Sequence, residues 1–227
     1  MLQLPLDVHL DDSAKFENFF AGSNLQLVSR LQSLKQTDCD FLYVWGSEHA
    51  GKSHLAQAIC QDYASDNLTA AYFPLDNKML EPEVLEGLEF ANLVCLDAFD
   101  AIVGEHRWEI ALFNLFNVLK ANNKQLVIFS ELPHAHSALK LADLKSRLSS
   151  METYKLNGLS DSERVSFLIQ SGKHRGLEIP LEVAQYLLAR TEREVSNLTS
   201  IVKLLDKQSL THQRKITIPF VKSVLDY

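Results

Sequence analysis

Short apolar runs alternate with helical patterns along the first two thirds of the chain, and this alternation constrains the fold most. The runs have no polar residue at every second position, which is typical of strands buried on both faces of a sheet. Such strands interleaved with helices predict a parallel sheet covered on both sides, and therefore an α/β fold. We expect the strands at residues 41–45, 70–75, 92–97, 125–130 and 153–156.

After Leu156 the strand pattern stops, and the rest of the 227-residue chain reads as helices alone. Ser160 and Glu163 have the spacing of a capping box at a helix start, and Gly176 is a typical helix stop. The sequence therefore predicts a small all-helical domain over 157–227, after an α/β domain over 13–156 and an N-terminal arm over 1–12.

Two short segments of the α/β part are harder to assign. Ser13 is placed to cap a short helical segment that contains "FENFF", and Pro82 stands near the start of another short stretch, "EPEVLEGLEF". We expect a short helix in each.

The net charge of −7 is unevenly distributed. Residues up to Leu156 carry 12 basic against 21 acidic side chains, and residues after it carry 10 against 8. An acidic body disfavours duplex DNA as a direct ligand. No apolar run is long enough for a membrane span. Three scattered cysteines without metal-ligand spacing predict reduced thiols in a cytoplasmic protein: Cys39, Cys60 and Cys95.

The stretch "GSEHAGKS" matches the phosphate-binding pattern G-x-x-x-x-G-K-[ST] in full, between a predicted strand and a predicted helix. Glycines let the backbone approach a phosphate, and the following helix presents its free N–H groups to the anion. Lys52 would neutralise the β and γ phosphates, and Ser53 would offer a hydroxyl to Mg²⁺. The expected nucleotide contacts are Gly46, Ser47, Glu48, His49, Ala50, Gly51, Lys52, Ser53 and His54.

Asp97 ends the strand "NLVCLD" and is the expected second ligand of Mg²⁺. The next residue is Ala98, whose methyl group cannot polarise a water molecule. Asp100 and Glu105 are the nearest acidic side chains, and the sequence does not give their geometry. We therefore expect slow or negligible hydrolysis by this chain alone.

These motifs together resemble the AAA+ ATPases, and within them the nucleotide-binding module of the DnaA replication initiator. The chain is most similar to the Hda family of small DnaA homologues, which inactivate the initiator in bacteria. The stretches "FENFFAGSN", "DLKSRL" and "RKITIPFVK" carry this resemblance. DnaA has a helix-turn-helix domain after its helical lid, whereas this sequence ends there. The resemblance implies an AAA+ body with a five-stranded parallel sheet, followed by a helical lid.

The resemblance also implies roles for single residues. Ser130 and Glu131 stand where the family has its sensor 1 residues, although Asp is usual at the second position. Arg147 in "LKSRL" matches the arginine finger, which acts on the nucleotide of a neighbouring subunit. Arg193 in "EREVSNL" matches sensor 2, which reaches from the lid to the bound phosphates.

The N-terminal arm resembles the peptide with which Hda proteins dock on the sliding clamp. The matching residues are Gln3, Leu4, Pro5 and Leu6. In one register the spacer between Gln-Leu and the following Pro-Leu is missing. In the other register Met1 stands where the family has Gln, and the sequence leaves the two registers open.

Two functions are consistent with these features. In the first, the chain holds ADP (or ATP) with Mg²⁺ and supplies Arg147 to DnaA on the DNA-loaded sliding clamp. It would thereby limit re-initiation of replication. The chain would contact DNA only through the clamp and would bind no membrane. It would act in the cytoplasm, and a homo-oligomer is possible. In the second, it is an autonomous AAA+ ATPase of the helicase-loader or DnaA-like type. The sequence leaves open whether the chain is itself an enzyme.

Overall fold

The computed structural model describes residues 10–11, 13–136, 138–212 and 215–225. It divides into two compact units, one ending at Asn157 and the other beginning at Gly158. None of the helices in the described ranges combines the length and apolar character that crossing a membrane requires.

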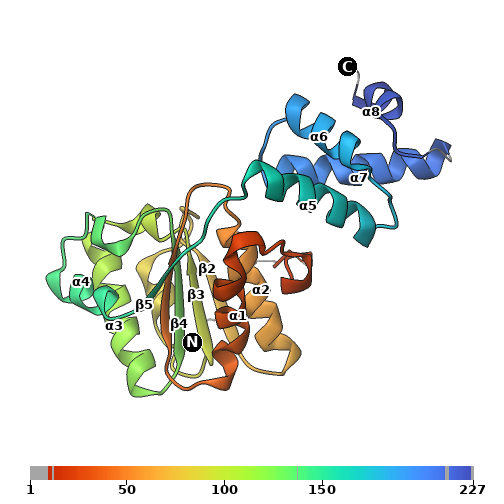
Figure 1. Ribbon diagram of the computed structural model, residues 1–227. Coiled ribbons are helices and arrows are strands. Elements are labelled where there is room, and N and C mark those ends of the chain that lie inside the picture. Colours follow the sequence, from red (N-terminus) through yellow and green to blue (C-terminus); the bar gives the residue numbers. More distant parts are fainter. Residues whose placement is uncertain (1–9, 12, 137, 213–214, 226–227) are drawn as a thin grey trace. The chain divides into compact units, whose positions relative to one another are not determined.

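The first unit contains one sheet of five parallel strands in the order β2-β3-β4-β1-β5, which confirms the predicted fold class (Figure 1). Because β4 lies between β1 and β3, the carboxyl ends of these three strands meet at one edge of the sheet. The strands are β1 (Phe41–Trp45), β2 (Ala70–Pro74), β3 (Leu93–Asp97), β4 (Gln125–Ser130) and β5 (Glu152–Lys155).

Helices cover both faces of the sheet, with α1 and α2 on one face and α3 and α4 on the other (Figure 1). The α-helices of this unit are α1 (Leu25–Ser33), α2 (Lys52–Ser65), α3 (His106–Ala121) and α4 (Ala142–Ser149). Its 3₁₀ turns are Phe16–Asn18, Gly22–Asn24, Leu34–Gln36, Pro82–Leu85, Phe99–Ile102 and His134–His136.

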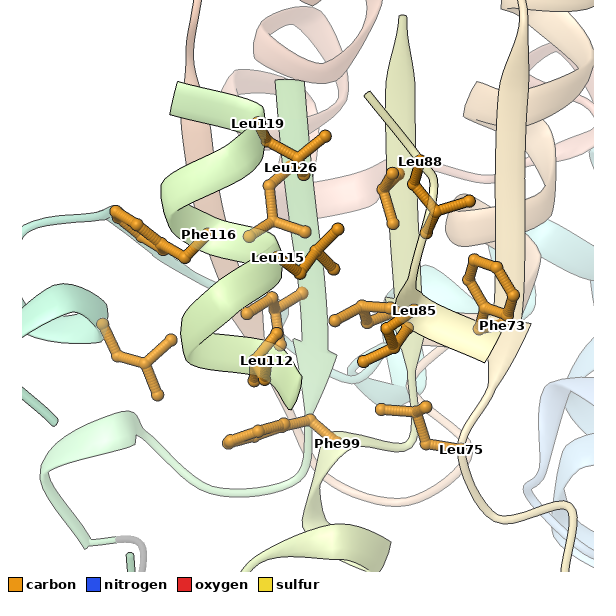
Figure 2. Packing of buried hydrophobic residues seen from close by; sticks show 14 of the residues in the cluster. Phe73, Leu75, Leu85, Leu88, Phe99, Leu112, Leu115, Phe116, Leu119 and Leu126 are labelled. Atoms are coloured by element: carbon orange, nitrogen blue, oxygen red, sulfur yellow. The ribbon is translucent and has the colours of Figure 1, made fainter. Parts of the chain in front are cut away.

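Successive residues of each central strand enter opposite cores, as the alternation of a pleated strand requires. In β1, Tyr43 belongs to the core under α3, whereas Leu42 and Val44 belong to the core under α1 and α2. Figure 2 shows the first of these cores, where leucines of α3 pack on β4 and on the segment before β3. The continuous apolar runs in the sequence follow from this burial on both sides.

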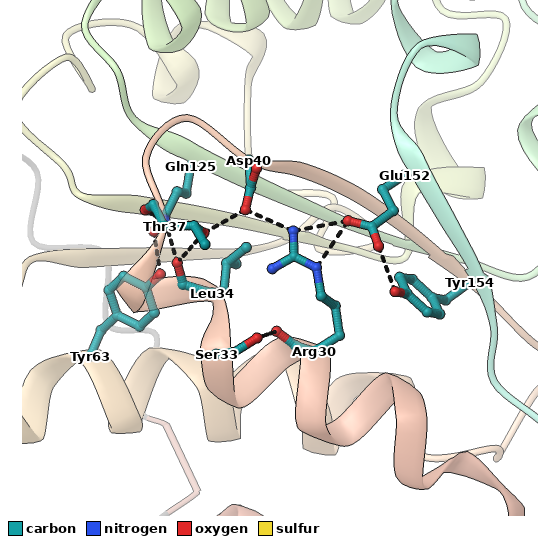
Figure 3. A network of polar contacts seen from close by, with 9 residues as sticks. All are labelled: Arg30, Ser33, Leu34, Thr37, Asp40, Tyr63, Gln125, Glu152 and Tyr154. Atoms are coloured by element: carbon teal, nitrogen blue, oxygen red, sulfur yellow. Dashed lines mark hydrogen bonds and ion pairs between the residues drawn. The ribbon is translucent and has the colours of Figure 1, made fainter.

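A polar network ties α1 to the starts of β1 and β5 (Figure 3). The Arg30 guanidinium pairs with Asp40 at 2.7 Å and with Glu152 at 2.9 Å. Burial opposes ionisation of Asp40, but hydrogen bonds from Thr37 and Arg30 outweigh it, and the pKa of Asp40 lies below its usual value. The pKa of Glu152 is lowered in the same way, by Arg30 and Tyr154 against the effect of burial.

Two short segments differ from the sequence prediction. The N–H and hydroxyl of Ser13 both donate to Asp11, so Ser13 does not cap a helix, and the turn starts only at Phe16. The segment at Pro82 forms a 3₁₀ turn that ends at Leu85, followed by Gly87 at φ +70°. Local side-chain bonds and a left-handed glycine interrupt both segments before a full α-helix forms.

The second unit is all helical, as predicted for the lid. The capping box of Ser160 and Glu163 is present at the start of the first helix, and Gly176 follows its end at φ +75°. Pro180 stands at the N-cap of the next helix. The helices are α5 (Asp161–His174), α6 (Leu181–Arg190), α7 (Val195–His212) and α8 (Ile218–Leu225).

Candidate nucleotide-binding site

The glycine-rich loop connects the carboxyl end of β1 to the start of α2. The N–H of Gly46 donates to the Ser130 carbonyl at 3.1 Å, which joins the loop to the neighbouring strand β4. Gly51 is the N-cap of α2 at φ +101°, and a Cβ built there would lie 2.8 Å from the Phe19 ring. Backbone conformation and the nearby ring both require glycine at this position.

The first glycine of the loop is required for a different reason. A Cβ on Gly46 would lie 2.4 Å from the carbonyl oxygen of Leu156, and the Leu156 N–H donates to Trp45 at 2.7 Å. The last residues of the first unit therefore run against the start of the loop. Asn24, which is buried, exchanges two hydrogen bonds with the backbone of Asn157 and fixes this segment from the other side.

Lys52 begins α2, and its ammonium group lies over the loop. Its Nζ donates to the carbonyls of Gly46 and Ser47, at 2.9 Å each. Ser53 follows in the first turn and is exposed. His54 is held by the segment before α1, with its Nε2 at 2.9 Å from the Lys15 carbonyl and its ring centroid 5.5 Å from that of Phe19.

Asp97 lies buried at the end of β3, with 4% of its surface exposed. The Tyr72 hydroxyl donates to one of its oxygens and the Ala98 N–H to the other, each at 2.9 Å. Burial and the neighbouring Asp97 charge raise the pKa of Tyr72, so it remains a donor. Ala98 has a left-handed backbone at φ +54° and begins the 3₁₀ turn after the strand.

The carboxylate of Asp100 is bound to the end of β4. It accepts the Ser130 hydroxyl at 2.8 Å and the backbone N–H groups of Glu131 and Leu132. Asp100 thus holds the two residues predicted to be sensor 1, and its carboxylate is already hydrogen-bonded. No sequence pattern predicts this pairing, because Asp100 and Ser130 are 30 residues apart and belong to no common motif.

Glu105 is the other acidic side chain that the sequence places near Ala98. It is exposed at the N-cap of α3, without a side-chain capping bond. Of the two acidic side chains near Ala98, Asp100 is therefore bound to the end of β4, and Glu105 stands at the start of α3.

The groups at this edge fit a nucleotide with Mg²⁺. Lys52 supplies a cation, and the N-terminus of α2 supplies backbone N–H groups for phosphate oxygens. Ser53 and Asp97 offer the oxygen ligands that Mg²⁺ prefers. The metal would neutralise phosphate charge, while the protein residues hold and orient the phosphates.

Arg147 lies on α4 and is partly buried. Its guanidinium carbon lies 5.9 Å from the ring centre of Phe113 and 5.7 Å from that of Phe116. Among the residues that the structure describes, no carboxylate forms an ion pair with Arg147.

Arg193 lies two residues before α7, in the second unit. It pairs with Asp161 at 3.0 Å, and Asp161 also pairs with Arg164 at 2.9 Å. This contact lies within the lid, so the reach of Arg193 to a bound phosphate stays a prediction.

The predicted clamp-binding residues lie outside the described residues; these are Gln3, Leu4, Pro5 and Leu6. The first described residues are bound to α2. The Asp11 N–H donates to Gln57 at 2.8 Å, and the Gln61 amide donates to the Asp11 carbonyl at 2.7 Å.

Known proteins match this chain both in its second unit and along its whole length. A family model described as "Hda, lid domain" matches residues 161–225. The chain is 41% identical, over 231 residues, to a protein of Haemophilus influenzae described as uncharacterized; the match covers 99% of this chain and 98% of that one.

Solved structures share the fold. Domain III of the Thermotoga maritima replication initiation protein DnaA matches with a TM-score of 0.76 and 21% identity, over 96% of this chain and 98% of that one. AMPPCP-bound DnaA from Aquifex aeolicus matches with a TM-score of 0.74 and 23% identity, over 89% of this chain and 68% of that one. The second unit therefore matches the lid domain of the Hda family, and the chain as a whole shares the fold of these DnaA structures.

Proposed function

We propose that this protein is a regulator that stimulates hydrolysis of ATP bound to DnaA, while it is itself held on the DNA-loaded sliding clamp. It binds ADP or ATP with Mg²⁺ in its own loop site. The arm over residues 1–12 docks on the clamp, and Arg147 enters the nucleotide site of DnaA. Conversion of ATP-bound to ADP-bound DnaA then limits re-initiation of replication.

Nucleotide binding is supported by the loop geometry. Gly51 has the left-handed backbone that the loop needs, Lys52 lies over the loop, and Asp97 is held at the carboxyl end of β3, on the same edge of the sheet. Solved DnaA structures of the same fold are described as bound to AMPPCP.

The observation that carries the proposed role is the environment of Arg147. It is a cation on an eight-residue helix, stacked on aromatic rings and without an ion pair among the described residues. A positive charge supplied in trans to a transferring phosphoryl group is worth about 10³ to 10⁵ in rate in comparable systems. By contrast, Ala98 and the occupied Asp100 leave this chain's own site poorly equipped to activate water.

The test measures conversion of DnaA-bound ATP to ADP, with clamp on DNA, for three variants. Arg147→Ala should bind ADP and clamp like the wild type but fail to stimulate hydrolysis. Arg147→Lys should rescue poorly, because lysine lacks the planar fork of donors. Arg107→Ala is the matched control, since Arg107 is exposed and lies in the same unit. Wild-type stimulation by Arg147→Ala would contradict the proposal.

An autonomous AAA+ ATPase is the second candidate, favoured by the complete loop and by Asp97 at the end of β3. It predicts turnover by the pure protein, stimulated by DNA. Our proposal instead predicts intrinsic turnover below about 1 s⁻¹, the lower end of typical enzyme rates. Brisk turnover without DnaA would favour the second candidate.

A further inference from the structure

Three residues of α3 form a stripe along the helix face that meets α4. Glu109, Phe113 and Phe116 are separated by four and three positions, the spacing of neighbours on one helix face. Phe116 is buried, and Phe113 packs against the same core. Figure 2 shows Phe116 at the margin of this core, on the side of α3 away from Leu85.

Glu109 is buried, with 1% of its surface exposed, and within the described part of the chain its carboxylate accepts hydrogen bonds from backbone N–H groups. The Gly104 N–H donates to Oε1 at 2.9 Å. The Lys140 N–H lies 3.1 and 3.0 Å from the two oxygens, and the Leu141 N–H donates to Oε2 at 2.7 Å. A buried carboxylate requires such compensation, and here it joins α3 to two other segments.

The bonds from Lys140 and Leu141 fix the start of α4. Leu141 is the N-cap of that helix, where a nearby negative charge also complements the helix dipole. Leu144 and Leu148 then seat the helix in the core, and Arg147 lies between them with its guanidinium over the two phenylalanine rings. One face of α3 therefore contacts α4 at its start and again at Arg147.

We propose that Glu109 is a positioning residue for Arg147, and that Phe113 and Phe116 form the aromatic support that orients its guanidinium. Glu109 sets the direction of α4 from its first residue, and the rings set the direction of the side chain near its end. This inference rests on the proposed role of Arg147 in trans. It adds residues that do not touch the nucleotide of DnaA themselves.

The chemistry of Glu109 makes the proposal specific. In Glu109→Gln, one carboxylate oxygen becomes an amide group that donates hydrogen bonds. That donor would face the N–H of either Gly104 or Leu141, so at least one of these bonds is lost. The side chain keeps its size, so the change acts on the start of α4 more than on packing.

The test titrates the protein, with clamp on DNA, against ATP-loaded DnaA, and it separates the plateau rate of hydrolysis from the protein concentration that gives half of that rate. Displacement of a catalytic arginine by about 1 Å can cost up to 10²-fold in rate. Glu109→Gln should lower the plateau by about tenfold or more, with the half-saturating concentration unchanged. A merely structural defect would lower the folded fraction and raise the half-saturating concentration. Glu89→Gln, the same substitution at an exposed site, is the control.

A second variant avoids dependence on Glu109, in case its replacement prevents folding. Phe113→Leu keeps an apolar side chain and removes one ring from beneath the guanidinium. It should lower the plateau rate of hydrolysis several-fold, because a cation–π contact stabilises the position of the guanidinium about as much as one weak hydrogen bond. Circular dichroism and ADP binding should match the wild type.

The accompanying readout is the NMR signal of the Arg147 side chain, identified as the arginine signal that Arg147→Ala removes. The rings should shift its proton resonances upfield, and both Glu109→Gln and Phe113→Leu should reduce the shift. An unchanged shift and plateau in both variants would overturn the positioning role. If Arg147→Ala abolishes stimulation in the same assay, the proposed function survives that result. If Arg147→Ala keeps the wild-type plateau, the proposed function fails and the positioning role fails with it.

Discussion

At the scale of single residues, the candidate site depends on a few backbone and charge requirements that the structure makes explicit. Gly51 is needed for its left-handed backbone, and Gly46 because the Leu156 carbonyl lies against it. Lys52 stays close to the loop through two carbonyl contacts. A phosphate would offer this ammonium group a charged partner in place of neutral ones, which is the stronger hydrogen bond.

Lys52→Ala should therefore weaken ADP binding. Loss of a hydrogen bond to a charged group corresponds to about 1.5–3 kcal/mol, or roughly 10- to 150-fold in the dissociation constant. Isothermal titration of ADP with Mg²⁺ measures this, and Lys120→Ala, at an exposed site on α3, should bind like the wild type. Equal affinity of Lys52→Ala and the wild type would refute the assignment of the loop.

At the scale of elements, the network of Arg30, Asp40 and Glu152 joins α1, the start of β1 and the edge strand β5 (Figure 3). Both carboxyl groups have a pKa below the usual value in the folded protein. Such groups stabilise the fold above their unfolded pKa, and that contribution is lost as the pH falls through the folded pKa.

Arg30→Gln should lower the free energy of unfolding by about 1 kcal/mol at pH 7, since the pairs are partly exposed. The difference from the wild type should persist down to about pH 4 and shrink below it, where Asp and Glu become protonated. Urea unfolding of both proteins between pH 3 and 7 measures it. A difference that stayed constant down to pH 3 would show that the ion pairs are not its source.

The strands were predictable because each central strand is buried on both faces and its sequence is continuously apolar. The two short 3₁₀ turns were not predictable, because Ser13 donates its N–H to Asp11 and so does not cap a helix, and Gly87 ends the segment after Pro82. Within the site, the loop and Asp97 follow from local motifs. The bonds of Asp100 to β4 and of Glu109 to the start of α4 are formed by packing between distant segments, which no local pattern encodes.

At the scale of the whole molecule, the chain has an α/β unit followed by a helical unit that matches the Hda lid domain. Residues 10 and 11 are the first described, and Asp11 is bonded to α2. The hydrogen bonds of Asp11 and the described core of the α/β unit do not involve residues 1–8, so we expect removal of these residues to leave that core in place.

Deletion of residues 1–8 should abolish binding to the sliding clamp and leave ADP binding and thermal stability near wild type. Surface plasmon resonance with immobilised clamp measures the first, and ADP titration and a thermal melt measure the others. If the shortened chain still bound the clamp, another surface would do the docking.

In our proposal, Arg147 acts on a nucleotide held by another protein. The most direct measurement loads DnaA with radiolabelled ATP and this protein with unlabelled ADP, and then combines them with clamp on DNA. We expect the label to convert to ADP with the wild type and to stay as ATP with Arg147→Ala, although both bind the clamp equally. Equal conversion of the label by both proteins would contradict it.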